Sequence, residues 1–325
     1  MSEQPPADEG KPLRAGIIGL DTSHAPAFAG FLNSDKATGD AAGVKVVAAF
    51  PGGSADIPDS ANRVEGFTKK LAELGVEIVP SIDALLEKVD VVLLESVDGR
   101  PHLAQAIPVI KAKKPLFVDK PVAGSLADAV ALFELAKEHG VPCFSSSSLR
   151  FSKGIIGMRD DRRVGEIVGC EARGPCSLEP HHPDLFWYGI HGVETLFTIM
   201  GPGCVEVART QTDGTDFVVG RWKDGRVGTY RGLRAGSHGY GATVYGSKGI
   251  APSGGYDGYE PLLVEIVKFF KTGKPPVSAD ETLEIYAFME AADESKRQGG
   301  KPVSIESVLA KARSEAPSRA AAAGK

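Results

Sequence analysis

Residues 13–24 of this 325-residue chain, LRAGIIGLDTSH, decide the fold. The apolar run at residues 15–18 has the composition of a buried strand, and Gly19 follows it where a tight turn can lead into a helix. A strand, turn and helix in this order aim backbone N–H groups and the positive end of the helix at an anionic ligand. The stretch therefore predicts a phosphate site at the carboxyl end of the first strand.

Two positions of this turn depart from the G-x-G-x-x-G pattern of dinucleotide-binding turns. Counted from Gly19, the second and third glycines are replaced by Asp21 and His24. Glycines at these positions normally allow close approach to the pyrophosphate and close packing of helix on strand. A carboxylate there repels phosphate, so either the cofactor is held from elsewhere or Asp21 caps the helix and turns its charge away. A plain helix cap, with no bound dinucleotide, is the alternative that stays open.

Composition indicates a globular protein of two domains. The chain is 42% hydrophobic and 24% charged, with a formal net charge of -5, and its length allows two cores. Without a Lys/Arg cluster, neither nucleic acid nor a membrane surface is the expected partner. The four cysteines show no C-x-x-C spacing and predict reduced core thiols. No segment is long enough to span a bilayer, and we expect a cytoplasmic protein.

The first half alternates apolar runs with amphipathic stretches, as in a doubly wound parallel sheet. We expect an α/β fold with a disordered N-terminus over residues 1–12, a nucleotide-binding domain over 13–148, a second α/β domain over 149–312 and a disordered tail over 313–325. Predicted strands of the first domain are residues 14–18, 44–50, 77–79, 89–95, 115–118 and 141–144, and predicted helices are 24–33, 60–74, 81–88, 101–113 and 125–139.

The second half has a different pattern past residue 145. Alternating runs between residues 205 and 246 are separated by Asp-Gly turns, such as residues 213–214, and predict antiparallel hairpins. We therefore expect an open, mainly antiparallel sheet here. Its exposed face predicts homo-dimers or homo-tetramers.

Four motifs carry a resemblance to a known family. They are GIIG at residues 16–19, DVVLLE at 90–95 followed by His102, VDKPV at 118–122 and GIH at 189–191. Together they resemble the Gfo/Idh/MocA (glucose-fructose oxidoreductase / inositol dehydrogenase) family over residues 13–305. The resemblance implies a Rossmann domain, then a domain with an open sheet, and a carbohydrate-metabolising oxidoreductase that acts on a sugar, cyclitol or related polyol with NAD or NADP.

The resemblance also implies two catalytic residues, Lys120 and His191. The Asp119-Lys120-Pro121 tripeptide resembles the family's Glu-Lys-Pro motif. It places a lysine where it can accept a hydroxyl proton or stabilise an alkoxide. His191 is expected to hydrogen-bond or deprotonate the same hydroxyl. The family's Asp four residues before this His is Trp187 here, so an orienting carboxylate is missing at that position. Asp184, His181, His182 or Tyr188, which lie nearby in the sequence, can take over its role. An exposed lysine and a merely packed histidine are the alternatives.

The other candidate residues divide between cofactor and substrate. Residues 50–54, FPGGS, lack the acidic or basic residue that normally distinguishes NAD from NADP, so the choice stays open; Asp56 or Arg63 can reach back. The candidates are Gly19, Leu20, Asp21, Thr22, Ser23, His24, Ser54, Ser96, His102, Asp119 and Lys120 for the cofactor, and Arg150, His181, His182, Asp184, Trp187 and Tyr188 for a small sugar-like substrate.

Other functions stay open from the sequence. A metal held by His24, His181, His182 and His191 with Asp21 or Asp184 has no recognised ligand spacing, so we expect no metal site. A lyase or hydrolase of an oxidised sugar, with a trapped or absent nicotinamide, is one alternative function. A non-catalytic sugar or nucleotide sensor is the other.

Overall fold

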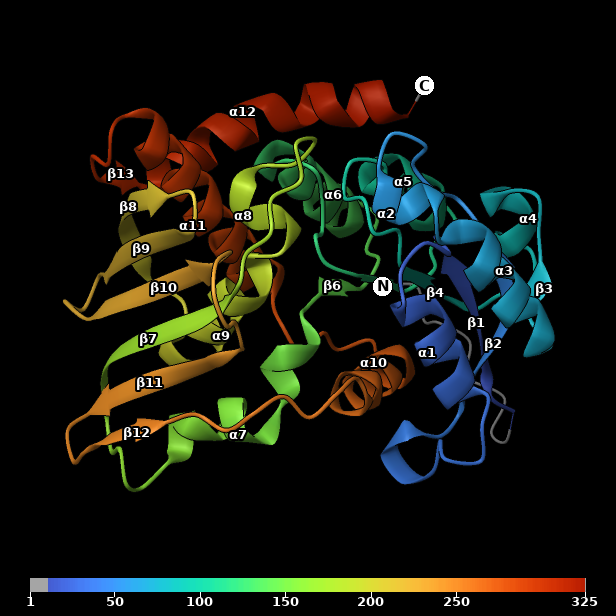
Figure 1. Ribbon diagram of the computed structural model, residues 1–325. Coiled ribbons are helices and arrows are strands. Elements are labelled where there is room, and N and C mark those ends of the chain that lie inside the picture. The colour runs from blue at the N-terminus through green and yellow to red at the C-terminus, as the bar shows by residue number, and fades with distance from the viewer. Residues whose placement is uncertain (1–10, 325) are drawn as a thin grey trace.

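The computed structural model describes residues 11–324 and places two sheets side by side, with helices packed around them (Figure 1). The first sheet has six parallel strands in the order β3-β2-β1-β4-β5-β6. The order reverses between β1 and β4, which is where doubly wound sheets bind their ligands. The predicted disorder of residues 1–10 lies outside the described residues. The strands are β1 (Leu13–Ile18), β2 (Val44–Phe50), β3 (Glu77–Ile78), β4 (Val91–Leu94), β5 (Leu116–Val118) and β6 (Cys143–Ser145).

Helices cover both faces of this sheet. The apolar sides of α1, α3 and α10 pack on one face, and those of α4, α5 and α6 pack on the other. The single helix predicted over residues 60–74 is two helices, α2 and α3, because the buried Ser60 hydroxyl bonds to the Asp21 carboxylate and holds α2 against the first turn. The helices are α1 (His24–Leu32), α2 (Pro58–Ala61), α3 (Val64–Glu73), α4 (Ile82–Leu86), α5 (His102–Lys111), α6 (Leu126–Glu138) and α10 (Glu260–Thr272).

The second sheet has seven strands in the order β12-β11-β7-β10-β9-β8-β13. The predicted hairpins β8–β9 and β9–β10 are antiparallel, whereas β7 pairs in parallel with β10 and separates it from β11. The predicted α/β class, with a mainly antiparallel second sheet, is confirmed. The strands are β7 (Ile167–Pro175), β8 (Cys204–Thr212), β9 (Thr215–Trp222), β10 (Val227–Leu233), β11 (Gly241–Gly246), β12 (Ile250–Pro252) and β13 (Val303–Ser304), and the helices of this half are α7 (Lys153–Ile156), α8 (Asp184–Trp187), α9 (Ile190–Met200), α11 (Ala279–Arg297) and α12 (Ile305–Ala323).

Two C-terminal helices cross back to the first domain, so the domains are not simple consecutive segments. The apolar side of α10 joins the core beside β1, and α12 runs along the top of Figure 1 over α6. The disordered tail predicted from residue 313 is wrong for residues 313–323. Ala312 and Ala316 are buried, and alanine combines high helix propensity with a side chain small enough for close packing.

The core is continuous across the two halves. Buried residues of the first sheet's α6 face join those of α9, α11 and the second sheet in one cluster. All four cysteines are buried and free. Within residues 11–324, no helix has the length and apolar composition needed to cross a membrane.

Candidate active site

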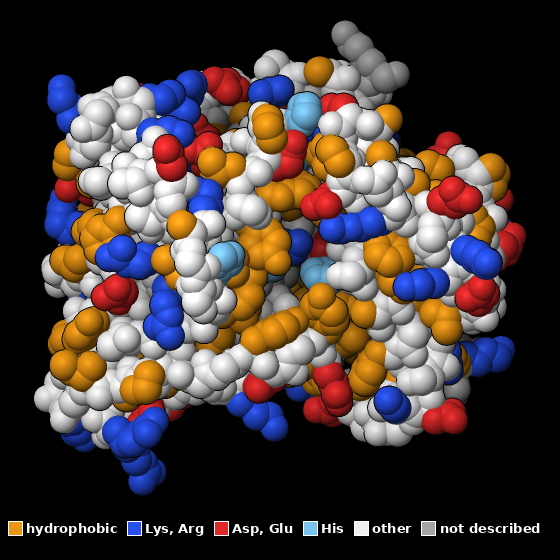
Figure 2. Space-filling model, in the orientation of Figure 1, with side chains coloured by type: hydrophobic (Ala, Val, Ile, Leu, Met, Phe, Trp, Pro, Cys, Tyr) orange, Lys and Arg blue, Asp and Glu red, His pale blue; other side chains and the backbone are white. Residues whose placement is uncertain are grey.

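A pocket of about 440 Å³ lies where the two domains meet, at the carboxyl edge of the first sheet. Figure 2 shows the hollow between the halves, with hydrophobic side chains and histidine on its walls. The pocket brings together seven residues that the sequence proposed for the site: Thr22, Ser23, His24, Lys120, Trp187, Tyr188 and His191. The other described residues that line it are Asp59, Arg63, Phe67, Val97, Ser148, Leu149, Ser177, Tyr240, Tyr256 and Tyr259.

The first turn brings the start of α1 into the pocket wall. Gly19 has φ +92°, and a Cβ there would lie 2.3 Å from the backbone N of Ser96, so only glycine fits between the two loops. Asp21 does not cap the helix, since Ser23 occupies the N-cap position. Its buried carboxylate accepts hydrogen bonds from the Ser60 Oγ at 2.6 Å and the Val97 N at 2.9 Å, and burial raises its pKa. The Asp21 carboxylate is therefore turned away from the pocket.

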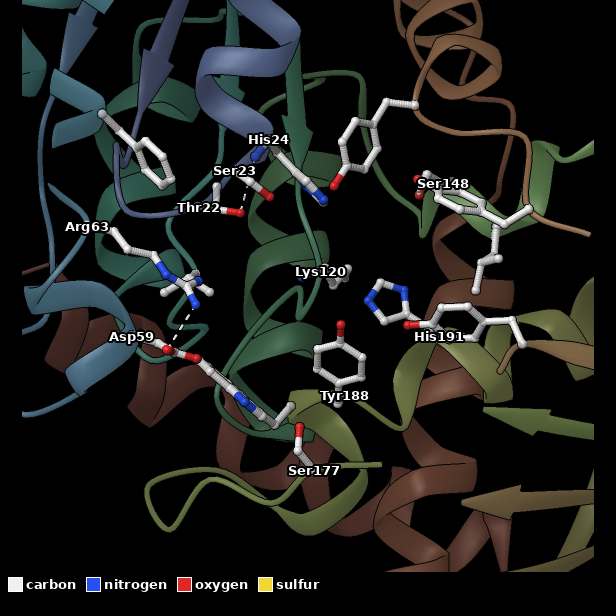
Figure 3. Close-up of a pocket in the computed structure, with 17 residues that line it drawn as sticks. Thr22, Ser23, His24, Asp59, Arg63, Lys120, Ser148, Ser177, Tyr188 and His191 are labelled. Atoms are coloured by element: carbon white, nitrogen blue, oxygen red, sulfur yellow. Dashed lines mark hydrogen bonds and ion pairs between the residues drawn. The ribbon is translucent and has the colours of Figure 1, made fainter. Parts of the chain in front are cut away.

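Lys120 follows β5 and lies at the centre of the pocket in Figure 3. Asp119, just before it, lies on the other side of the extended chain. The Asp119 Oδ2 is 2.6 Å from the His24 Nδ1. Burial raises the pKa of Asp119, but the charges of His24 and Lys120 outweigh it and lower the value to about 2. The motif thus places the Lys120 side chain in the pocket and the Asp119 side chain in the interior.

His191 comes from the second domain, near the start of α9. A Cβ on the neighbouring Gly192 would lie 2.2 Å from the Tyr230 ring, so glycine lets α9 lie close to β10. The His191 Nδ1 is 2.7 Å from the Ser147 Oγ, and the Ser147 N donates to Glu194 at 2.7 Å. Ser147 therefore bonds the His191 ring, where the sequence had offered Asp184, His181, His182 or Tyr188 for that role. Burial, with the charges of Lys120 and His24, lowers the pKa of His191 well below its usual value, so the ring is neutral at physiological pH.

Four tyrosines, Tyr188, Tyr240, Tyr256 and Tyr259, line the pocket. Tyr188 and Tyr240 lie edge-on to His191, with ring centroids 5.3 Å and 5.7 Å away. Tyr256 and Tyr259 come from the segment just before α10. The sequence prediction missed Tyr240, Tyr256 and Tyr259, although the recurrence of tyrosine in the glycine-rich residues 236–259 was an available signal.

Four of the residues predicted for the substrate do not line the pocket. Each has polar partners elsewhere, and these contacts hold it away from the pocket. The four histidines considered as metal ligands likewise have separate partners and do not converge. Arg150 bonds Glu194 and Glu281 at 2.7 Å, His181 lies 2.8 Å from Glu179, His182 lies 3.1 Å from Asp98, and Asp184 accepts from Arg209 at 2.8 Å and from Lys296 at 2.7 Å.

Seven predicted cofactor residues also lie outside the pocket wall, namely Gly19, Leu20, Asp21, Ser54, Ser96, His102 and Asp119. Some of them tie the loops of the first sheet together. The His102 Nε2 is 2.8 Å from the Ser96 carbonyl oxygen, which links α5 to the loop after β4. The backbone turns and buried bonds of these residues shape the crevice, so they support the pocket wall and do not form it.

The segment after β2 is joined to the loop after β4. Ser54 donates to Asp98 at 2.6 Å, and the Arg100 guanidinium bonds both Asp56, at 2.8 Å, and Asp98, at 2.7 Å. Burial raises the pKa of Asp98, but hydrogen bonds from His182, Arg100 and Ser54 outweigh it and hold the value well below the usual range. These contacts close the crevice between the two segments.

Trp187 occupies the position where the family resemblance predicted a carboxylate. From the second domain, it closes the crevice between the segments after β2 and β4. Its ring is 8% exposed and packs with Ile57 and Val97 in a small apolar cluster. The tryptophan is therefore part of the wall between the domains and has no part in orienting His191.

Comparison with known proteins agrees with this architecture. Residues 13–147 match the model of an oxidoreductase family with an NAD-binding Rossmann fold, GFO_IDH_MocA. A curated relative, myo-inositol 2-dehydrogenase of Thermotoga maritima, is 24% identical over 272 residues, which cover 68% of this chain and 81% of the relative.

Solved structures show the same fold over nearly the whole chain. Scyllo-inositol dehydrogenase from Lactobacillus casei, with bound cofactor NAD(H) and scyllo-inositol, has a TM-score of 0.73 at 16% identity, covering 91% of this chain and 100% of its own. Myo-inositol 2-dehydrogenase from Lactobacillus plantarum has a TM-score of 0.72 at 18% identity, covering 90% and 99%. Residues 13–147 are thus similar to the NAD-binding domain of the Gfo/Idh/MocA oxidoreductases, and the chain as a whole shares the fold of these solved structures.

Proposed function

We propose that this protein is an NAD(P)-dependent oxidoreductase that acts on a hydroxyl or keto group of a sugar, cyclitol or related polyol. One observation carries the proposal. Lys120 and His191 come from different domains and line a single pocket, together with the start of α1. The inositol dehydrogenases among its relatives support a polyol as the substrate.

The pocket residues fit the phosphate and nicotinamide parts of the cofactor. Thr22 and Ser23 at the positive end of α1, with the Arg63 guanidinium on the facing wall, would hold the phosphates (Figure 3). Lys120 and His191 lie beyond them, where the substrate would meet the nicotinamide. When bound, the dinucleotide supplies the hydride acceptor or donor.

The chemistry of the protein's own groups follows from their charge. In oxidation, the neutral His191 ring accepts the hydroxyl proton at Nε2, while the Lys120 ammonium stabilises the developing alkoxide. In reduction, the same two groups polarise the carbonyl and return a proton. Hydroxyls of Tyr188, Ser148 and Ser177 are available to the other hydroxyls of a polyol.

The proposal is tested by cofactor titration followed by turnover. NADH and NADPH are titrated against the protein by fluorescence, and a panel of cyclitols and sugars is then scanned for a change in nicotinamide absorbance. Binding with turnover of at least one polyol supports the proposal. Binding without turnover of any polyol contradicts it in favour of a sensor or a trapped-cofactor lyase, and absence of binding excludes both nicotinamide functions.

Removing Arg100 is expected to tighten cofactor binding. Dinucleotide folds bind the adenosine ribose just after the second strand, where Arg100 now joins Asp56 to Asp98. The cofactor can bind there only after this partly exposed bridge breaks, which costs free energy. Arg100→Ala removes that cost and should lower the Kd for NADH by about 2–5-fold. Fluorescence titration measures the change. Arg63→Ala removes a positive charge from the pocket wall and should weaken binding; weaker binding in both variants would contradict the role assigned to Arg100.

We also propose assembly through the outer face of the second sheet. Val227, Tyr245 and Ile250 form a row across β10, β11 and β12, aligned through Gly169 of β7, and are 47%, 37% and 68% exposed. An exposed apolar row of this kind favours pairing with a second copy. By light scattering, Ile250→Glu should reduce the mass of a dimer or tetramer, whereas Leu74→Glu on the first domain should not. A monomeric wild type would exclude this assembly.

A cytoplasmic location belongs to the same proposal. Four free, buried thiols suit a reducing compartment, where disulfides do not persist. Cell fractionation tests the location, and recovery in an oxidising compartment would contradict it.

A further inference from the structure

Three metal-ligating side chains converge behind the pocket wall. They are His24 at the start of α1, Glu95 after β4 and Asp119 after β5, and they are 6%, 0% and 1% exposed. The His24 Nδ1 lies 2.6 Å from the Asp119 Oδ2 and 4.0 Å from the Glu95 Oε2. One ligand atom from each residue lies within 4.8 Å of the other two. The carboxyl ends of two neighbouring strands thus meet the start of a helix.

Both Glu95 oxygens and the Asp119 Oδ1 are buried with no hydrogen-bond donor among residues 11–324. The nearby backbone supplies none, because the Glu95 N donates to the Ile18 oxygen and the Asp119 N donates to the Leu94 oxygen. Buried carboxylate oxygens are normally paired, since loss of their hydration costs free energy. These orphaned oxygens therefore point to an occupant that can satisfy several of them at once.

The His24 ring is held in position for such an occupant. It stacks on Phe28 at 5.3 Å with an interplanar angle of 8°, and the Tyr259 ring packs edge-on against it at 4.6 Å. These contacts keep Nδ1 directed at Asp119. His24 also lines the pocket, which gives an ion a route from solvent to the two carboxylates.

The ligand set selects the class of occupant. One imidazole nitrogen and two carboxylates suit first-row divalent ions such as Zn²⁺ and Mn²⁺. We propose that His24, Glu95 and Asp119 form a binding site for one divalent cation of the Zn²⁺/Mn²⁺ class.

The test uses the full chain without cofactor or substrate, so it is independent of the proposed dehydrogenase activity. Protein stripped with a chelator is dialysed against Zn²⁺ or Mn²⁺, and bound ion is measured by elemental analysis. One ion per chain is expected for the wild type, with anomalous diffraction locating it between the three side chains. Glu95→Gln keeps the shape of the side chain but is a poorer ligand, and it should lower affinity by at least about tenfold. Glu73→Gln, on the exposed surface of α3, is the matched control.

A stability measurement guards against misfolding of the variant. Saturating ion should raise the Tm of the wild type but not of Glu95→Gln, whose own fold is checked by circular dichroism without metal. Binding below one ion per chain, or binding unchanged in Glu95→Gln, overturns the proposal. An ion-free wild type whose infrared spectrum shows a protonated carboxyl band, lost in Glu95→Gln, also overturns it, because a proton then occupies the cluster.

Discussion

We expect Lys120→Ala to lower kcat by about 100-fold or more, a loss of about 2.7 kcal/mol of transition-state stabilisation. Lys120 is the lysine that lines the pocket next to His191, so its removal leaves the developing alkoxide without a neighbouring positive charge. The measurement is steady-state turnover with whichever polyol the cofactor assay identifies. Because the ammonium acts most strongly on the charge that develops in the transition state, kcat should fall more than KM rises.

Lys111→Ala provides the comparison for this result. Lys111 is an exposed lysine in the last turn of α5, away from the pocket, and its loss should leave kcat unchanged. Unfolding curves for both variants show whether the fold is intact. If Lys120→Ala retains near-normal turnover with an intact fold, Lys120 has no part in the chemistry.

We expect Arg209→Met to destabilise the protein by about 3–5 kcal/mol, the usual cost of removing one partner from a buried ion network. The Arg209 guanidinium is fully buried and bonds Asp216 at 2.8 Å and Asp184 at 2.8 Å, with Asp293 as a third partner. Methionine fills much of the volume but leaves these carboxylates without their shared cation. Denaturant unfolding monitored by circular dichroism measures the loss.

Arg221→Met is the matched exposed substitution. Arg221 is 56% exposed and pairs with Glu206 at 3.4 Å, so its removal should cost less than about 1 kcal/mol. Equal losses in the two variants would mean that the buried network stabilises the fold no more than a surface pair. Since Asp184 opens α8, which carries Trp187, Arg209→Met should also loosen the wall between the domains.

Local sequence patterns were reliable where neighbouring residues alone determine the structure. The apolar run before Gly19 forms β1, and the Asp-Lys-Pro motif follows β5, as strand periodicity and the family resemblance predicted. The same kind of reasoning gave a wrong prediction for the C-terminal tail. Composition shows that residues 313–323 lack large apolar side chains, but not that small alanines can lie against α6 as a helix.

Charged residues were the weakest part of the site prediction. His182 and Asp184 looked available for substrate because a sequence does not show their partners. Their partners Asp98 and Arg209 lie 84 and 25 positions away in the chain, and only folding brings them within hydrogen-bond distance. The sequence did not indicate Ser147 as the partner of His191 either, because this contact also joins residues far apart in the chain.

The sequence by itself determined the two-sheet α/β fold and the turn at Gly19, and it proposed Lys120 and His191, which both line the pocket. These depend on short-range patterns and motifs, which survive without knowledge of distant contacts. Only the tertiary structure decided that Asp21 turns inward, that the segments after β2 and β4 are joined, and that His24 meets Glu95 and Asp119. Burial and long-range pairing set the charge and direction of each such side chain, and both arise only when distant strands are packed side by side.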